Sequence, residues 1–558
     1  MLFKKINLIF ILVLLYQTPL YSKSTSSNDI NSKNLSKYFS GIVAFQNKDN
    51  SKALDYFNSS KILLNKHDPY LKRYVYSLVL ANKIPQAINV IKSNKDKKDL
   101  NFFDAHLLLI LDYLNKNQME QAYEYLININ NFEEEDRFDQ AILESLKEYI
   151  YVFKENKILE NKKDFGKLSI ISEAFQRCYL NDKGTDEYFL NLINDVEADY
   201  TRYNFFLLSY LIENDRIADI RNITRKIDYV NSTLLLSQGK SWIENGDAKN
   251  LIKVFSCFNA NDIVSEFLFL VSNLYSSQDN FERSNFFLYL SSFLNPEFIY
   301  NFSLVAENQY FNEEYKKVKK TIKRFKKEDN FYYWYRVKKQ AQIIAKQRSK
   351  KESLNYITAE FNKIEKPNDK ILFDIANFYK NSKEYKEAIK YYTKIIETLD
   401  DNSEIKQDLL YRRGGSFERI GEYAKADRDL LHSIKINPND AYVLNYLAYS
   451  WLERDFKINE AIKMLEKAYS LKNNDPYIID SIGWAYYLIN DFPKAEKFLK
   501  RAVELMPHDP IVNDHYGDIL WKLDRKIQAR YFWANVLKMD DAEKKIIDSI
   551  NIKMIKGL

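Results

Sequence analysis

The chain has 558 residues, 11 glycines and a formal net charge of +6 at pH 7. So few glycines exclude a β-rich fold with many tight turns, and no alternation of strand and helix patterns indicates an α/β fold. The length would suit several globular domains, but an array of repeats needs no single large core.

The chain begins with the features of a secretory signal peptide. Two lysines precede a short apolar stretch, Leu8 to Tyr16, and a cleavage site ends at the small residue Ser22. An apolar stretch of about ten residues is too short to span a bilayer. We expect residues 1–22 to be removed on export to a bacterial periplasm, with 23–34 as a polar leader. The alternative is that these residues form a buried N-terminal helix. No cysteine follows the apolar stretch, so the sequence predicts no lipid attachment.

Small residues then recur at a fixed spacing. Ala53, Ala87 and Ala122 are 34 and 35 residues apart, and the residues in register with them are Gly41, Phe57, Ile91 and Leu126. This is the period of helix–turn–helix repeats, in which each unit buries its apolar face only by stacking on a neighbour. The spacing predicts an N-terminal array over residues 35–154.

Residues 155–264 are helical by pattern, as in 205–212, but no register holds through them. They are either degenerate units of one continuous array or an irregular helical segment between two arrays. Gly239 to Ser241 looks like the end of a phosphate-binding loop, yet Leu234 stands where that loop needs glycine. The favoured interpretation is a helix with a small residue at a crossing point.

Both cysteines of the chain, Cys178 and Cys257, lie in this segment. They could pair in an oxidising compartment, but spacing alone establishes no bridge. The apolar neighbours Val254, Phe255 and Phe258 favour Cys257 as a small core residue. We expect unpaired, buried cysteines, with a disulfide as the alternative.

The repeat is most regular in the last half of the chain. Its small position falls on Ser284, Val318, Ser353, Ala388, Ala426, Ala461, Ala495 and Ala529, with steps of 34, 35, 35, 38, 35, 34 and 34. The best-preserved unit carries Ile479, Ile482, Gly483, Tyr486, Ala495, Leu499, Ala502 and Pro507. This pattern resembles the tetratricopeptide repeat (TPR) family. The resemblance implies an all-α, TPR-type α-solenoid, and we place the C-terminal array at residues 265–540 and a capping helix at 541–558.

Aspartates mark the starts of successive helices in this array. Asp440, Asp475 and Asp509 are 35 and 34 apart, and Pro476 and Pro510 follow two of them. Aspartate is a preferred N-cap, and proline costs nothing in the first helical turn because its missing N–H would be unpaired there anyway. These residues predict three first helices in register.

A run of cations could indicate nucleic-acid binding. It comprises Lys316, Lys317, Lys319, Lys320, Lys323, Arg324, Lys326 and Lys327, beside the aromatic stretch 331–335. However, Val318, Ile322 and Phe325 mark a buried stripe at helical spacing, so the lysines fill the solvated convex side of a helix. Export also removes nucleic acid as a partner. The functional alternative is contact with an anionic membrane surface.

No catalytic constellation stands out. The histidines are His67, His106, His432, His508 and His515, and none has partners at metal-ligand spacing. No nucleophile elbow, HExxH motif or glycine-rich phosphate cradle occurs. We expect no cofactor, no metal and no enzymatic activity.

Function is then expected from the concave groove, which the first helices of TPR units line. The family's groove positions correspond here to Tyr442, Asn445, Tyr449, Tyr477, Asp480, Trp484, Tyr487, Asp514, Asp518, Trp521 and Lys522. Aromatic anchors dominate interface energetics, so this lining predicts peptide binding, with about a third of the residues packing against neighbours instead. Asp480 and Asp514 distinguish it from the TPR clamp that holds a terminal carboxylate.

Over its full length the chain resembles exported proteobacterial TPR proteins. The stretches that carry the resemblance are 444–450, 480–487 and 515–521. Some members are outer-membrane lipoproteins that hold a periplasmic C-terminal-processing protease and its cell-wall hydrolase substrates together. The resemblance implies an adaptor for protein partners, although this chain lacks the lipid-bearing cysteine. The alternative is an envelope assembly factor that contacts membrane or cell-wall polymer through its basic convex face.

Overall fold

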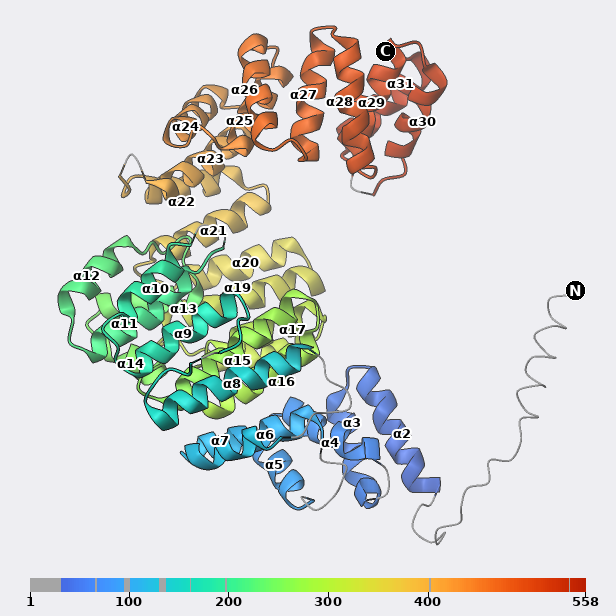
Figure 1. Ribbon diagram of the computed structural model, residues 1–558. Helices are drawn as coiled ribbons and strands as arrows, with labels where there is room; N and C mark the ends of the chain where they lie inside the picture. The colour runs from blue at the N-terminus through green and yellow to red at the C-terminus, as the bar shows by residue number, and fades with distance from the viewer. Residues whose placement is uncertain are drawn as a thin grey trace, which may run out of the picture. The chain divides into compact units, whose positions relative to one another are not determined.

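The computed structural model describes residues 32–65, 68–94, 101–129, 137–160, 162–195, 198–400, 403–540 and 542–558. Within these ranges the chain forms helices and turns and contains no strand (Figure 1). The all-α prediction is therefore confirmed. The predicted signal peptide, residues 1–22, and residues 23–31 of the leader lie outside the described residues.

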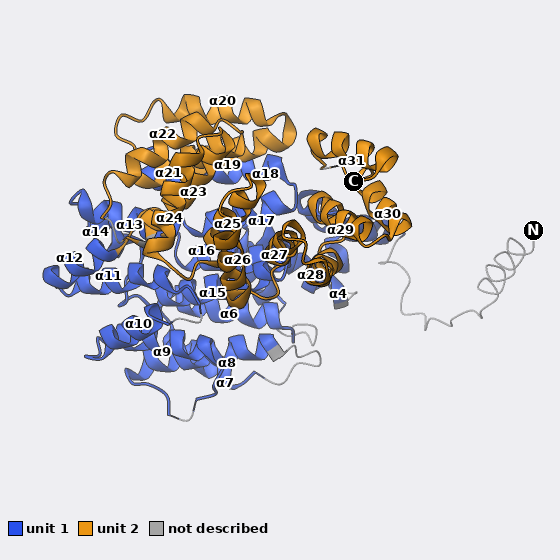
Figure 2. Cartoon of the chain, turned by 90° about the horizontal axis from the view of Figure 1, so that it is seen from above, with its two compact units in different colours: residues 1–226, 233–332 blue, residues 227–232, 333–558 orange. Residues whose placement is uncertain are grey.

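The chain divides into two compact units (Figure 2). Unit 1 takes residues up to 226 together with 233–332, and unit 2 takes 227–232 together with 333–558. The predicted domain boundaries stay predictions, since this division follows the packing of helices rather than the repeat pattern. No helix in the described ranges is long and apolar enough to cross a membrane.

Unit 1 is a succession of helix pairs along the chain, with the single helix α8 (Arg137–Glu155) between the third pair and the fourth. The pairs before α8 are α2 (Ser32–Gln46) with α3 (Asn50–Ser59), α4 (Asp68–Leu80) with α5 (Ile84–Lys92), and α6 (Phe103–Asn115) with α7 (Met119–Ile127). The pairs after it are α9 (Lys167–Tyr179) with α10 (Thr185–Ile193), α11 (Asn204–Glu213) with α12 (Ile217–Lys226), α13 (Leu234–Glu244) with α14 (Lys249–Val254), α15 (Ala260–Ser277) with α16 (Phe281–Leu294), and α17 (Asn301–Phe311) with α18 (Tyr315–Thr321). Short 3-10 helices are η1 (Lys61–Asn65), η3 (Thr201–Tyr203) and η4 (Ile322–Arg324).

Unit 2 continues the same arrangement and ends on the single helix α31 (Lys544–Lys556). Its pairs are α19 (Asn330–Gln347) with α20 (Lys350–Phe361), α21 (Asp369–Asn381) with α22 (Tyr385–Ile396), α23 (Glu404–Arg419) with α24 (Tyr423–Ile436), α25 (Ala441–Glu453) with α26 (Ile458–Leu471), α27 (Pro476–Leu488) with α28 (Phe492–Leu505), and α29 (Pro510–Lys522) with α30 (Lys526–Val536).

The small residues that framed the repeat occupy one structural position. Each lies on the second helix of a pair and is buried. The two helices of a pair pass so close together that both carry small residues where they cross. On the first helix, a Cβ atom added at Gly483 of α27 would lie 2.8 Å from Cγ of Leu499 on α28, and one added at Gly41 of α2 would lie 2.7 Å from the Phe57 ring. All eleven framed units are confirmed as helix pairs.

The predicted helix caps are also confirmed. The carboxylates of Asp440, Asp475 and Asp509 each accept hydrogen bonds from two backbone N–H groups of the following helix, at 2.9 to 3.2 Å. Pro476 and Pro510 stand at the first helical position. The aspartates therefore satisfy backbone donors that every helix start leaves unpaired.

Residues 155–264, in which no register could be followed along the sequence, contain three further helix pairs, α9 to α14. The same turn recurs between the two helices of a pair, with a left-handed residue at Asn181, Asp215 and Gly246. Asparagine, aspartate and glycine tolerate that backbone conformation best. Gly239 lies within α13 against Phe205, as expected for a helix crossing point rather than a phosphate loop.

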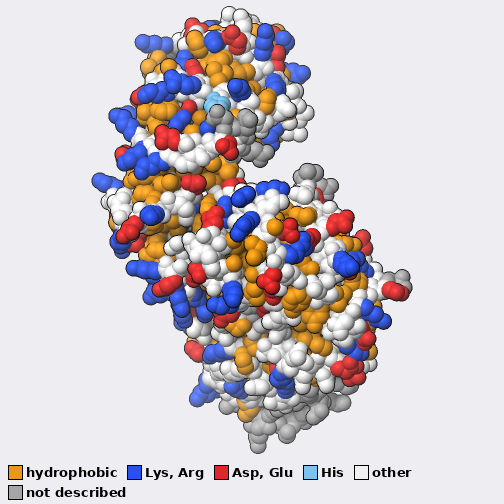
Figure 3. Space-filling model, turned by 90° about the vertical axis from the view of Figure 1, so that its left-hand side faces the viewer, with side chains coloured by type: hydrophobic (Ala, Val, Ile, Leu, Met, Phe, Trp, Pro, Cys, Tyr) orange, Lys and Arg blue, Asp and Glu red, His pale blue; other side chains and the backbone are white. Residues whose placement is uncertain are grey.

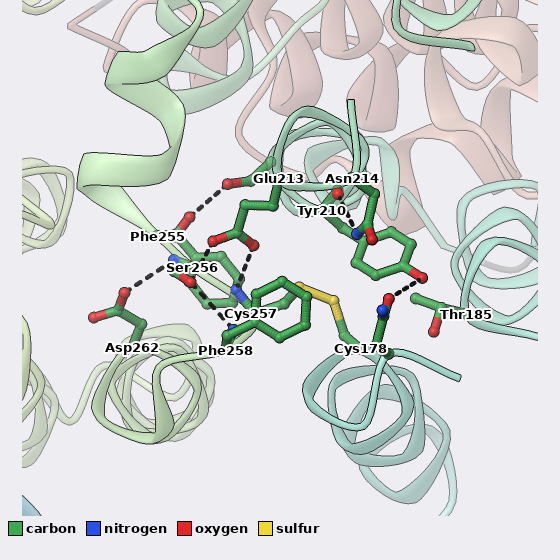
Figure 4. Close-up of a disulfide and its surroundings, with 12 residues drawn as sticks. Cys178, Thr185, Tyr210, Glu213, Asn214, Phe255, Ser256, Cys257, Phe258 and Asp262 are labelled. Atoms are coloured by element: carbon green, nitrogen blue, oxygen red, sulfur yellow. Dashed lines mark hydrogen bonds between the residues drawn. A yellow bond between two sulfur atoms is a disulfide. The ribbon is translucent and has the colours of Figure 1, made fainter. Parts of the chain in front are cut away.

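The expectation of unpaired cysteines is wrong, because Cys178 and Cys257 form a disulfide (Figure 4). It joins the end of α9 to the turn between α14 and α15, with the two Cα atoms 5.4 Å apart. Folding brings together two residues that are 79 positions apart in the chain. Both are fully buried, so the apolar surroundings inferred from the sequence are real, but they do not exclude a bridge.

Candidate partner-binding surface

The predicted groove residues lie on three successive first helices of unit 2, α25, α27 and α29. Tyr442, Tyr477 and Lys522 are exposed, and Asp480 and Asp518 are buried. The rest are half-buried: Asn445, Tyr449, Trp484, Tyr487, Asp514 and Trp521. The predicted set therefore includes surface side chains and side chains that hold neighbouring helices together.

Three aromatic rings form a continuous stack between α27 and α29. The Trp484 indole lies parallel to the Tyr487 ring at 4.6 Å on one side and to the His515 imidazole at 4.0 Å on the other. His515 Nδ1 donates a hydrogen bond of 2.9 Å to Asp480 Oδ2. Asp480 and Trp484 therefore bind His515 of the next unit and help to hold α27 against α29.

The C-terminal helix α31 lies against the last predicted groove residues. Lys553 donates to Asp514 at 2.6 Å and to both carboxylate oxygens of Asp518 at 2.8 Å. Gly557 packs so closely on the Trp521 indole that no side chain would fit there. The chain itself therefore covers part of the predicted groove, and Asp514, Asp518 and Trp521 are engaged by α31.

A row of exposed apolar side chains remains along the starts of the same three helices. Tyr442 of α25 is 49% exposed, Tyr477 of α27 is 59% exposed, and Ile511 of α29 is 42% exposed. These residues are 35 and 34 positions apart, so they occupy the same place in successive units. The Lys472 ammonium lies 5.0 Å from the centre of the Tyr442 ring. We call Tyr442, Tyr477 and Ile511 the exposed row.

Sequence reasoning missed three members of this region. Ile511 lies 34 residues after Tyr477, so the repeat spacing could have found it. Lys553 lies 35 residues after Asp518, so α31 occupies the register of a first helix. The sequence favours a helix-surface position for His515 over a metal ligand, but its side chain is buried. In the described ranges no three His, Cys, Asp or Glu side chains are placed to hold a metal ion.

Two buried groups in this region have raised pKa values. Burial alone would lower the pKa of His515, but the adjacent Asp480 carboxylate outweighs it and the pKa is raised. Burial and the neighbouring Asp514 raise the pKa of Asp518 to about 6, against the opposing effect of Lys553. Both groups hold their protons more tightly in the folded chain than in an unfolded one.

This protonation makes stability depend on pH. A histidine with a raised folded-state pKa stabilises the fold fully below its unfolded pKa of about 6.5, and the contribution is lost as pH rises through the folded value. Asp518 acts in the same direction, since its protonation favours the folded chain below about pH 6. We expect α27 and α29 to be protected more strongly from hydrogen exchange at about pH 6 than at about pH 8.5, after correction for the intrinsic exchange rate.

The variant His515→Gln should remove most of this difference and cost about 1–3 kcal/mol at pH 6, because Asp480 loses its buried partner. His508→Gln is the control, since His508 is exposed on the turn before α29. An equal pH difference in wild type and His515→Gln would contradict the assignment.

The cationic run has two environments. Val318, Ile322 and Phe325 are buried, as the helical spacing predicts. However, four members of the run, Lys317, Lys320, Lys323 and Arg324, line a pocket of about 980 Å³ within unit 1. These four side chains are exposed, as a solvated face predicts, but they line a hollow rather than a convex surface.

Comparisons with known proteins agree with the helix pairs. A family model described as tetratricopeptide repeat matches residues 369–398, the span of α21 and α22. The TPR repeat-containing protein PA4667 of Pseudomonas aeruginosa is 34% identical over 111 residues, which are 20% of this chain and 19% of that protein. The chain thus spans about a fifth of the length of this curated relative.

Solved structures are also similar in part. A tetratricopeptide repeat protein from Parabacteroides merdae is 15% identical, with a TM-score of 0.38, over 46% of this chain and 98% of that one. MamA from Desulfovibrio magneticus is 19% identical, with a TM-score of 0.27, over 32% of this chain and 97% of that one.

The matched repeat and the helix pairs in register with it define the class: the chain is an α-solenoid of helix–turn–helix units. Residues 369–398 match the tetratricopeptide repeat, and the chain is similar to proteins that contain this repeat. Arrays of this family generally mediate protein–protein interaction and are typically scaffolds rather than enzymes.

Proposed function

We propose that the protein is a non-enzymatic scaffold that binds a protein partner on the exposed row of its C-terminal helix pairs. The observation that carries this proposal is the row itself, in which Tyr442, Tyr477 and Ile511 repeat an exposed apolar side chain in three successive units. A soluble protein rarely aligns large apolar side chains on its surface without a partner. An extended or helical segment that follows the array would contact all three.

The acidic and aromatic residues behind the row support a pre-organised surface. The stack of Tyr487, Trp484 and His515 fixes α27 against α29, and Lys553 fixes α31 against α29. A surface that is rigid before binding loses less conformational entropy when its partner docks. Tyrosine at such a surface supplies a large contact area with few rotatable bonds.

We further propose that the scaffold acts in the periplasm. The signal-like first 22 residues support export, and the disulfide supports an oxidising compartment. The resemblance to exported adaptors extends the proposal to a link between a periplasmic protease and its envelope substrates. N-terminal sequencing of the mature protein from a periplasmic fraction tests it: a start near Lys23 is expected, and Met1 retained on a cytoplasmic protein would refute it.

The alternative of a basic convex face that contacts membrane or polymer has less support. Half of the cationic run lines a pocket, and on the face drawn in Figure 3 the Lys and Arg side chains are scattered among hydrophobic and acidic ones. No single basic surface appears in that view. We therefore favour protein binding.

The exposed row gives the decisive test. Tyr442→Ala combined with Tyr477→Ala should weaken binding of the partner by about 2 kcal/mol or more, the range of interface hot spots. The fold should change little, because both rings are largely exposed. The measurement is quantitative affinity capture from an envelope extract, followed by titration of each captured protein after purification.

Tyr531→Ala is the matched control, since Tyr531 is a tyrosine on the second helix α30 and is 63% exposed. Equal loss of binding in the control and in the Tyr442/Tyr477 variant would sink the proposal. Trp484 and Trp521 are poorer choices, since each also packs inside the array and its removal would weaken the fold.

A further inference from the structure

The pocket in unit 1 has a strongly cationic lining. Its walls are α3, the turns that follow α2, α4, α15 and α17, and parts of α16, α17 and the α18–η4 region. Six cationic side chains line it against four carboxylates. The cations are Lys48, Lys83, Lys317, Lys320, Lys323 and Arg324. Three of the turns that frame the pocket belong to different helix pairs, so the fold rather than one helix brings these charges together.

Several of these cations are not neutralised by the chain. Lys317 pairs with Glu314 at 2.6 Å, but among the described residues Lys320 and Lys323 have no carboxylate partner. The Arg324 guanidinium lies 4.1 Å from the centre of the Phe302 ring rather than on an acidic side chain. An excess of positive charge therefore faces the hollow, where a concave wall strengthens its field.

The helices and turns around the pocket are held in place by contacts between distant parts of unit 1. The Tyr76 ring stacks on Phe286 at 4.9 Å, and Arg283 donates to Asp104 at 2.7 Å. The Lys48 ammonium donates to Asn312 at 3.0 Å. These contacts join α4 and α6 to α16 and the turn after α2 to the turn after α17. The pocket is therefore formed before any ligand arrives.

We propose that this pocket binds an acidic segment of a protein partner. Carboxylates of the segment would pair with Lys320, Lys323 and Arg324. Phe45 and Phe281 in the lining would contact its apolar side chains.

The concave shape favours a polypeptide over a membrane as the occupant. A hollow of about 980 Å³ admits a single chain, whereas a flat lipid surface would meet only the rim. The proposal goes beyond the exposed row, since the pocket lies in unit 1 and the row in unit 2. A failure of either site leaves the other unaffected.

The experiment uses the full mature chain and a fluorescein-labelled oligo-glutamate peptide, with binding followed by fluorescence anisotropy. The variant Lys320→Gln with Lys323→Gln removes two unpaired pocket cations. The control, Lys316→Gln with Lys326→Gln, removes the same charge from the same run, but these exposed lysines do not line the pocket. Circular dichroism establishes that both variants keep their helices.

The pocket variant should bind the peptide about tenfold more weakly than wild type, and the control should stay within about twofold. Equal losses in both variants would show that only net charge matters and would overturn the proposal. So would a wild-type chain that does not bind the peptide. A second arm uses phosphatidylglycerol vesicles: loss of vesicle binding in the pocket variant with peptide binding intact would assign the site to lipid instead.

Discussion

Replacing Cys178 and Cys257 together by alanine should cost unit 1 about 4 kcal/mol of unfolding free energy. The bridge closes a loop of 79 residues, and a cross-link over a loop of that length restricts the unfolded chain strongly. The loop runs from α9 to the start of α15, so helix pairs α11/α12 and α13/α14 lie inside it. The loss should therefore appear as faster hydrogen exchange in α9 to α15, while unit 2 exchanges as in wild type.

The bridge itself is checked first. Protein that is purified without a reductant and then denatured should not react with iodoacetamide, and reduction should expose two reactive thiols. Alkylation of both cysteines without reduction would show that the protein has no bridge, and hence that the bridge does not stabilise it. It would also weaken the proposal of an oxidising compartment.

The environment of the bridge explains why the sequence did not predict it. Glu213 accepts hydrogen bonds from the Cys257 backbone N–H and from the Ser256 hydroxyl, and Asp262 accepts one from the Ser256 backbone N–H at 2.9 Å (Figure 4). These carboxylates come from α11 and α15 and fix the turn that carries Cys257. Because the pairing depends on three separate elements, no local sequence pattern predicts it.

Periodicity predicted the regular pairs well, because TPR packing requires small residues at fixed intervals. Ala388, Ala461 and Ala495 are all fully buried where two helices cross. In residues 155–264 the period is not visible in the sequence, because a helix such as α11 is buried on every side. Its buried residues run without a break from Phe205 to Leu211. A helix without a solvent-facing stripe shows no amphipathic pattern. Asn181 and Asp215, whose backbones are left-handed at the turns, mark the repeat spacing that the hydrophobic pattern does not show.

The candidate sites were predictable only in part. The exposed row follows from the repeat spacing, so two of its three residues, Tyr442 and Tyr477, appear among the predicted groove positions. The role of His515 could not be inferred, because it depends on stacking between two units. The pocket depends on contacts such as the pairing of Lys48 with Asn312, 264 residues apart, and no repeat pattern encodes such a contact.

Gly483→Leu tests the packing rule on which the whole array depends. A Cβ atom at this position would lie 2.8 Å from Cγ and 3.0 Å from the backbone nitrogen of Leu499, so α27 and α28 must separate. Overpacking of this kind costs about 1–3 kcal/mol. In a solenoid each unit contacts only its neighbours, so hydrogen exchange should accelerate in α25 to α30 and remain unchanged in unit 1.

The control is Lys500→Leu, which adds the same side chain to the exposed face of α28. It should leave exchange in α25 to α30 as in wild type, since nothing there has to move. If Gly483→Leu instead unfolded all described helices in a single transition, the repeats would form one cooperative domain. The stability of the exposed row would then depend on unit 1 as well as on its own neighbours, because unfolding anywhere in the chain would remove the surface on which the partner binds.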